Sequence, residues 1–288
     1  MPGNTAQLPG IKKILIPLDG SAAAEAILPY IAGMAGHMGA GIILLTCVPQ
    51  GLKSGVPERQ YLEKAAALLR KRGLGVATVV HRGEPGPGIL EASREYEAGL
   101  IALSAHLKPG GRKDLLGSVV ADVLRSRAEP VLVLREEDGR AAEKGWTPPS
   151  AIIVGLDGST LSMTALPHAE ALADTFGSEV VLVRAVLPAD SLSGAAKYYG
   201  AVDDFAERYL AGIAETLRQR GRKVATRTGH KAPDQEVLAA ADSWPGSIIA
   251  MSTRGMTGRV NLMLGSVADR IIRAQRHPVL AIPAARGA

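Results

Sequence analysis

The sequence is poor in aromatic residues, contains one cysteine and has no hydrophobic run long enough to span a bilayer. Phe, Trp and Tyr make up 3% of its 288 residues, so the core must be built from Ala, Val, Ile and Leu. The single cysteine, Cys47, excludes an intramolecular disulfide and a cysteine-rich zinc site, and it fits a reducing compartment. It lies in an apolar run, so we expect a small buried side chain there.

The apolar runs fall far short of the roughly 20 residues that a membrane span needs, and the N-terminus has no apolar core of signal-peptide length. We therefore expect a soluble, cytoplasmic protein with no membrane partner.

Several functions are also excluded by what the sequence lacks. The net charge of +5 would suit an anionic ligand. No run of Lys and Arg exceeds three residues, however, and few aromatics could stack on bases, which argues against nucleic acid. There is no Gly-x4-Gly-Lys-Ser/Thr motif and therefore no P-loop. The six histidines fall in separate predicted elements without Cys or carboxylate at ligand spacing, so we expect no metal site. No Ser-His-Asp or Cys-His constellation can be placed on strand ends, which argues against an ordinary hydrolase.

The two halves of the chain are duplicates. The segment "KILIPLDGSAAAEAILP" at 13–29 matches "AIIVGLDGSTLSMTALP" at 151–167, 138 residues later. Further along the chain the offset becomes 148, so the second half carries a ten-residue insertion between Val186 and Gly221. The repeat predicts one structural unit that occurs twice.

Each half alternates strands with helices and predicts its own domain, residues 1–137 and residues 148–288. In the second half we expect strands over 151–157, 179–186, 223–228, 247–252 and 278–283, and helices over 159–176, 203–221, 234–243 and 266–274. Continuously apolar strands separated by helices form a parallel sheet with helices on both faces. Each domain is therefore predicted to be a doubly wound α/β fold of five parallel strands. Its ligand would bind beyond the carboxyl ends of the strands, where the strand order reverses. The charged and then proline-rich linker suits an exposed join.

The last strand of each half is short and apolar, and it lies at an edge of its predicted sheet. An exposed edge strand invites unwanted association. We therefore predict that "PVLVL" at 130–134 pairs antiparallel with "PVLAI" at 278–282, so that the halves pack as a pseudo-dimer. The chain would then be a monomer with an intramolecular pseudo-dimer, or a homodimer.

An aspartate closes the first predicted strand of each half, Asp19 in the first and Asp157 in the second. A carboxylate at this edge can accept hydrogen bonds from a base or a sugar. The alternative role is helix capping, because Asp or Ser before a helix accepts hydrogen bonds from unpaired backbone N–H groups, and Ser159 is also placed to cap. The two roles do not exclude each other, so Asp157 stays a candidate for both.

A glycine-rich stretch, "STRGMTGRVNLMLGS" at 252–266, follows the fourth predicted strand of the second half. Glycines allow backbone N–H groups to turn toward a phosphate, and a helix N-terminus adds partial positive charge. We predict a phosphate site here, with Arg254 and Arg259 in reach of the phosphates. The alternative is a flexible loop that ends in a serine-capped helix. The candidate residues are Ser252, Arg254, Gly255, Gly258, Gly265 and Ser266.

These motifs together resemble the universal stress protein family: "ILIPLDGS" and "IIVGLDGS" as first strands, a Gly-x2-Gly-x9-Gly-Ser loop, and "HPVLAIP" as last strand. The resemblance covers nearly the whole chain, twice. It implies a strand order of 3-2-1-4-5 in each half and pairing of the two last strands. In the ATP-binding branch it also implies that the first-strand Asp and a second-strand Val hold the adenosine. In this sequence those residues are Asp157 and Val183, and Gly255, Gly265 and Ser266 would hold the phosphates.

The first half departs further from the loop pattern than the second. In the second half the first glycine of the pattern is replaced by Ser252. In the first half Leu107 adds a side chain, Pro109 removes an N–H and Asp114 adds negative charge where a phosphate would lie, although the Gly-Ser at the helix start is kept. We therefore expect one adenine nucleotide per chain, ATP or else ADP or AMP, in the second half, with Mg²⁺ accompanying ATP.

On this resemblance we expect a stress-response regulatory protein that binds an adenine nucleotide in its C-terminal half. No general base or acceptor site is visible in the sequence, so at most slow ATP hydrolysis or autophosphorylation is expected. The alternative is a nucleotide-free interaction module or chaperone-like scaffold, which the altered loop of the first half favours. An unidentified protein partner is expected in either case.

Overall fold

The computed structural model describes residues 11–51, 55–105, 117–125, 129–186, 199–253, 264–274 and 276–283. In the first half the strands are β1 (Lys13–Pro17), β2 (Gly41–Val48), β3 (Val76–Arg82), β4 (Leu100–Ser104) and β5 (Val131–Leu134), and the helices are α1 (Ala22–Glu25), α2 (Leu28–Met38), α3 (Val56–Arg70), α4 (Pro85–Glu95) and α5 (Ser118–Arg125). Helix α6 (Glu136–Glu143) follows β5. In the second half the strands are β6 (Ala151–Gly155), β7 (Glu179–Ala185), β8 (Val224–Gly229), β9 (Ile248–Ser252) and β10 (Val279–Ile282), and the helices are α7 (Thr160–Met163), α8 (Leu166–Phe176), α9 (Tyr199–Gln219), α10 (Pro233–Ser243) and α11 (Ser266–Ala274).

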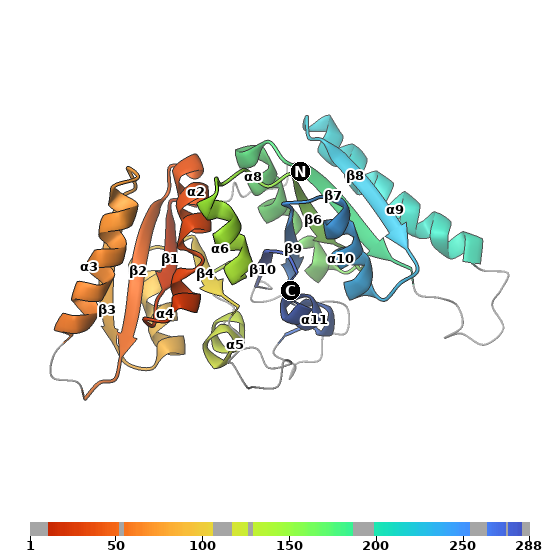
Figure 1. The fold of residues 1–288 in the computed structure, drawn as a ribbon. Helices are drawn as coiled ribbons and strands as arrows, with labels where there is room; N and C mark the ends of the chain where they lie inside the picture. The colour runs from red at the N-terminus through yellow and green to blue at the C-terminus, as the bar shows by residue number, and fades with distance from the viewer. Residues whose placement is uncertain are drawn as a thin grey trace, which may run out of the picture.

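The described strands form one continuous ten-stranded sheet in the order β3-β2-β1-β4-β5-β10-β9-β6-β7-β8 (Figure 1). Within each half the five strands are parallel. Parallel neighbours need long crossover connections, and the helices supply them. The predicted α/β class and the order 3-2-1-4-5 are thus confirmed.

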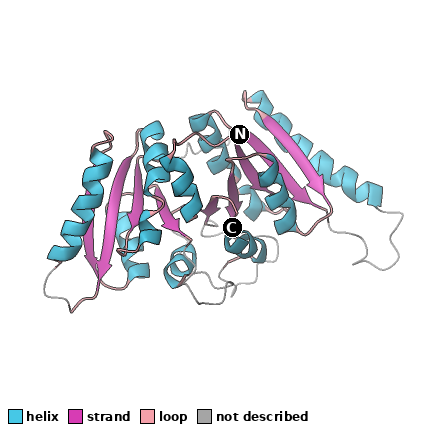
Figure 2. Cartoon of the chain, in the orientation of Figure 1, coloured by secondary structure: helices cyan, strands magenta, loops and turns pink. Residues whose placement is uncertain are grey.

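Helices cover both faces of the sheet (Figure 2). Successive strand residues point to opposite faces, and both faces carry apolar side chains that the helices bury. Ile14 and Ile16 of β1 belong to one buried cluster, to which α2, α3, α8 and α9 contribute. Leu15 belongs to the other cluster, with α4, α5, α10 and α11. Within the described ranges, Phe176 is the one aromatic residue buried in either cluster, as the composition of the chain requires.

The two halves join through β5 and β10, which pair antiparallel. Val133 lies opposite Val279, and Leu132 lies opposite Leu280. The predicted pairing of the last strands is therefore confirmed, and neither strand leaves an edge exposed at this seam.

The linker is exposed over most of 143–150, as its composition suggested, but its first part is packed. Residues 136–143 form helix α6, in which Asp138, Gly139 and Ala142 are buried. Helix α6 packs on α2 and on the turn before it, where a Cβ built on Gly139 would overlap the carbonyl oxygen of Ala26. Arg135 and Asp138 form an ion pair at the start of α6, and the backbone N–H of Arg135 donates to Asp138 Oδ2 at 2.9 Å. The charges of the linker thus stabilise a packed helix.

Two predicted helices of the second half differ in extent from those observed. The helix expected over 159–176 is divided into α7 and α8, because Pro167 has no N–H to continue the helical hydrogen bonds. The helix expected from 203 begins at Tyr199. Helix α9 has 21 residues and its counterpart α3 has 15, so part of the ten-residue insertion lengthens this helix.

Candidate functional site

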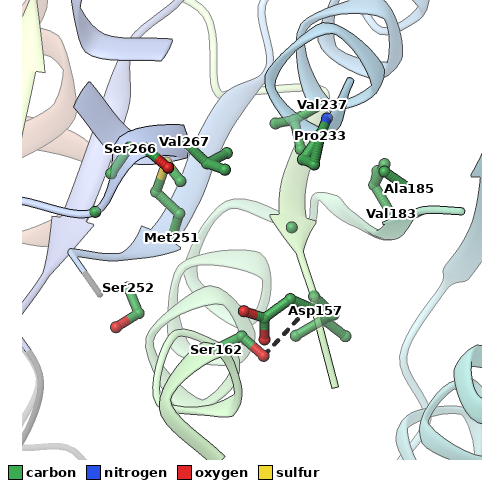
Figure 3. A pocket seen from close by; sticks show the side chains of 14 residues that line it. Asp157, Ser162, Val183, Ala185, Pro233, Val237, Met251, Ser252, Ser266 and Val267 are labelled. Atoms are coloured by element: carbon green, nitrogen blue, oxygen red, sulfur yellow. Dashed lines mark hydrogen bonds between the residues drawn. The ribbon is translucent and has the colours of Figure 1, made fainter. Parts of the chain in front are cut away.

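A cavity of about 210 Å³ lies at the carboxyl ends of the second half's strands (Figure 3). Residues of β6, β7 and β9 and of the segments that follow them form its walls, together with helices α7, α10 and α11. The lining residues are Gly155, Leu156, Asp157, Ser162, Val183, Ala185, Pro233, Val237, Met251, Ser252, Gly265, Ser266, Val267 and Ala268. Five predicted site residues, Asp157, Val183, Ser252, Gly265 and Ser266, are therefore brought together in one place.

The position of the cavity follows from the topology. Strand β6 pairs with β7 on one side and with β9 on the other. The chain runs outward from β6 to β7 and β8 and then crosses back to β9, so the strand order reverses between β6 and β9. Connections leave such a point in opposite directions, and the crevice between them is the usual ligand site of an open α/β sheet.

Asp157 lines the cavity and also organises the turn that follows β6. The backbone N–H of Ser159 (2.9 Å) and its hydroxyl (2.6 Å) both donate to Asp157 Oδ1. Ser159 in turn caps α7, because its Oγ accepts from the N–H of Ser162 at 3.0 Å. The capping role thus belongs to Ser159, and Asp157 supports the turn while its side chain borders the cavity.

The opposite wall is apolar. Figure 3 shows Val183 and Ala185 on one side of the cavity, across from Ser266, Val267 and Met251. Val183 is 1% exposed, and its carbonyl oxygen accepts from the N–H of Leu156 at 2.8 Å. Sequence reasoning missed Ala185, although the period of two along a strand places it on the same face as Val183.

The start of α11 closes the other end of the cavity. The N–H of Gly265 donates to the carbonyl of Thr253 at 2.7 Å, and the carbonyl of Gly265 accepts from Asp269 at 2.9 Å. Gly265 therefore forms the turn into the helix and offers no free donor. The next three residues, 266–268, line the cavity, and N–H groups in the first turn of a helix have no partner within the helix. These donors and the helix dipole favour an anion here.

The rest of the predicted glycine-rich loop, with Arg254, Gly255 and Gly258, lies outside the described residues. At the end of β9, Ser252 is 6% exposed and faces the cavity. The structure therefore describes only the two ends of the predicted phosphate loop, residues 252–253 and 264–266.

The corresponding edge of the first half carries bulkier groups. At the offset of 138 residues, Pro17 stands where the second half has Gly155, and Cys47 stands where it has Ala185. Cys47 is half-buried in β2, and its thiol donates to the carbonyl of Pro85 at 3.8 Å. The two halves therefore present different surfaces at equivalent places.

Over the described parts of the chain, no group of three or more His, Cys, Asp or Glu residues is placed to hold a metal ion. None of the helices in those parts is long and apolar enough to cross a membrane.

Comparison with known proteins gives consistent results. The model of the Universal stress protein family matches residues 10–135 and again residues 150–283. Universal stress protein Rv2005c of Mycobacterium tuberculosis is 25% identical over 227 residues, which are 77% of this chain and 75% of that protein. Universal stress protein MJ0531 of Methanocaldococcus jannaschii is 30% identical over 142 residues, 46% of this chain and 80% of that protein.

A solved structure shares the tandem arrangement. The crystal structure of a universal stress protein from Archaeoglobus fulgidus superimposes with a TM-score of 0.74 at 20% identity, and the match covers 95% of this chain and 98% of that one. At this identity the likeness shows the fold alone.

Proposed function

The chain belongs to the universal stress protein family, and we propose that its C-terminal half, residues 148–288, binds one adenine nucleotide (ATP, or ADP or AMP) as a regulatory ligand. The observation that carries the proposal is the cavity at the strand-order switch point, which joins the Asp157 carboxylate to the start of α11. In this proposal the N-terminal half, residues 1–137, is a second domain of the family without nucleotide.

The two ends of the cavity suit the two ends of a nucleotide. Val183, Val237 and Met251 offer apolar surface to a base, and the Asp157 carboxylate can accept a hydrogen bond from an amino group or a ribose hydroxyl. At the other end the first-turn N–H groups of α11 and the Ser266 hydroxyl suit phosphate oxygens. Arg254, Gly255 and Gly258 would complete the phosphate end, and Mg²⁺ would accompany ATP.

The difference between the halves supports a single site per chain. Pro17 has no backbone N–H and a larger side chain than Gly155, and Cys47 has a larger side chain than Ala185. Leu107, Pro109 and Asp114, which oppose phosphate binding in the sequence, lie outside the described residues. A nucleotide-free scaffold is the second candidate function, and the altered first half is the observation that favours it.

Isothermal titration with ATP, ADP and AMP tests the proposal. We expect one site per chain. A ligand at about 100 times its dissociation constant should also raise the free energy of unfolding by about 2.7 kcal/mol. Gly265→Val should abolish most of the binding, because a β-branched side chain would crowd the start of α11. Gly117→Val is the matched control at the equivalent helix start of the first half and should leave binding unchanged.

The possible outcomes separate the two candidate functions. Two sites per chain would refute the asymmetry between the halves. The absence of heat with all three nucleotides would refute the proposal and favour the scaffold.

A further inference from the structure

An arginine next to the cavity has no assigned role. Arg184 follows Val183 on β7, and its side chain lies on the opposite face of the sheet, against α9. Its guanidinium carbon is 4.6 Å from the centre of the Tyr209 ring and 5.8 Å from that of Phe205. The same guanidinium lies against Gly158, since a Cβ built on that glycine would be 2.8 Å from Nη1. Arg184 is thus held between an aromatic helix face and the turn that contains Asp157.

Among the described residues, this guanidinium forms no direct ion pair with a carboxylate. Its Nη1 is buried and has no hydrogen-bond partner in the part of the chain that the structure describes. Other half-buried arginines of this domain behave differently: Arg222 pairs with Asp174 and Glu170, and Arg227 pairs with Glu236. An unpaired buried donor on a cation costs free energy that stacking on an aromatic ring offsets only in part.

The equivalent turn of the first half forms without an arginine. Thr46 stands at the position of Arg184, and its hydroxyl donates to the carbonyl of Leu18 at 2.9 Å. Gly20 is the counterpart of Gly158, with φ values of +82° and +88°, and nothing lies within 4 Å of a Cβ built on Gly20. Folding of the Asp-Gly turn therefore does not require the arginine, which occurs in the half that has the cavity.

The charge of Arg184 acts on the same surroundings as the charge of Asp157. The pKa of Tyr209 is raised, mainly by burial. The charge of Arg184 lowers it and the charge of Asp157 raises it, so both charges act on the Tyr209 hydroxyl. Among the described residues, the groups that face the Asp157 turn include Arg184 from β7, Tyr209 from α9, and the hydroxyls of Ser159 and Ser162 at the start of α7.

We propose that Arg184 is a positioning residue of the ligand site: its guanidinium supports the Asp157–Gly158 turn and offsets the charge of the Asp157 carboxylate, so that the carboxylate is held as a hydrogen-bond acceptor at the cavity. The inference rests on the proposed nucleotide site and concerns its nucleoside end. It assigns the first half no such support, because Thr46 carries no charge.

A double-mutant cycle tests whether Arg184 acts through Asp157. The variants are Arg184→Met, which keeps the length of the stem, Asp157→Asn, and the two together, with AMP affinity measured by titration. Arg184→Met should weaken the binding of AMP about ten-fold in the otherwise unchanged chain. This is the order expected for the loss of one charge-assisted hydrogen bond, here the one between AMP and the Asp157 carboxylate. In the Asp157→Asn background the same change should cost less than about two-fold.

Two controls separate positioning from general damage. Arg184→Lys should recover part of the affinity, because it restores the charge without the planar stack. Arg184→Thr introduces the residue of the first half, where the turn folds, and should behave like Arg184→Met. Equal losses in both Asp157 backgrounds would overturn the inference while leaving the nucleotide site intact. An unmodified chain that binds no AMP would overturn the proposed function and the inference with it.

Discussion

Cys47 shows how one residue changes the character of a site between the two halves. Cys47 in β2 is the counterpart of Ala185 in β7. Burial raises the pKa of its thiol to about 11. The thiolate is the reactive species, so a thiol with this pKa is almost entirely protonated near neutral pH. Cys47, near the carboxyl end of the interior strand β2, is therefore a poor nucleophile.

We predict slow alkylation of Cys47 in the folded chain. At pH 7.5 iodoacetamide should modify it more than about 100-fold more slowly than in urea, where the pKa returns to about 8.5. The rate should rise about ten-fold per pH unit up to about pH 10, because the thiolate fraction does so while the pH is below the pKa. Mass spectrometry of quenched samples measures both rates, and a rate that levels off below pH 9 would contradict the assignment.

Individual site residues were predictable where a local rule applied. Asp157 and Ser159 follow an apolar strand and precede a helix, so their place at the ligand edge and the capping role of Ser159 could be predicted from sequence. Ala185 has no chemical signature, and only the period of two along its strand indicates that it shares a face with Val183. The role of Arg184 could not be predicted, because its environment depends on helix α9, which is distant in the sequence. Cys47 was expected to be buried and is half-buried, since it lies near the open end of its strand.

At the scale of elements, the most informative helix is the one that sequence patterning missed. Helix α6 has eight residues, most of them polar, so neither its length nor its apolar periodicity predicts a helix. It forms because Gly139 and Ala142 allow contact with α2. Helices α9 and α11 have a clear apolar periodicity and were predicted. The division of α7 from α8 also has a sequence signal, because Pro167 lies at the start of α8.

Two glycine-to-alanine substitutions in helices should have opposite effects. Gly139→Ala should lower the free energy of unfolding by about 1–3 kcal/mol, because the added methyl group would overlap the Ala26 carbonyl. Gly212→Ala, in the middle of α9, should raise it by about 0.5–1 kcal/mol, since nothing lies within 4 Å of the new Cβ and alanine has the higher helix propensity. Urea unfolding measures both. A neutral Gly139→Ala would mean that α6 does not pack on α2 as described.

At the scale of the whole molecule, the seam between the halves combines a predictable part with an unpredictable one. The pairing of β5 with β10 could be predicted, because two short apolar strands would otherwise leave sheet edges exposed. The contacts of Trp146 could not. Its ring lies 5.8 Å from His37 of the first half and 5.9 Å from Phe176 of the second, measured between ring centres. That arrangement depends on the path of the linker, which composition alone suggested to be exposed.

A continuous sheet with a shared core predicts that the halves unfold together. Leu132 and Leu280 face each other across the seam and are 1% and 2% exposed. Each Leu→Ala change should cost about 2–5 kcal/mol. The double variant should cost less than the sum by at least about 0.5 kcal/mol, because the second truncation enlarges a cavity that the first has opened.

Leu62 and Leu210 provide the matched control for this cycle. They are equivalent residues of α3 and α9, each fully buried, at opposite ends of the sheet. Truncating both to alanine should give additive losses, because the two sites lie at opposite ends of the sheet. Each single variant should also shift one common urea transition, since a shared seam couples the halves. Two separate transitions, or an additive Leu132–Leu280 pair, would show that the halves fold as independent domains joined only by the chain.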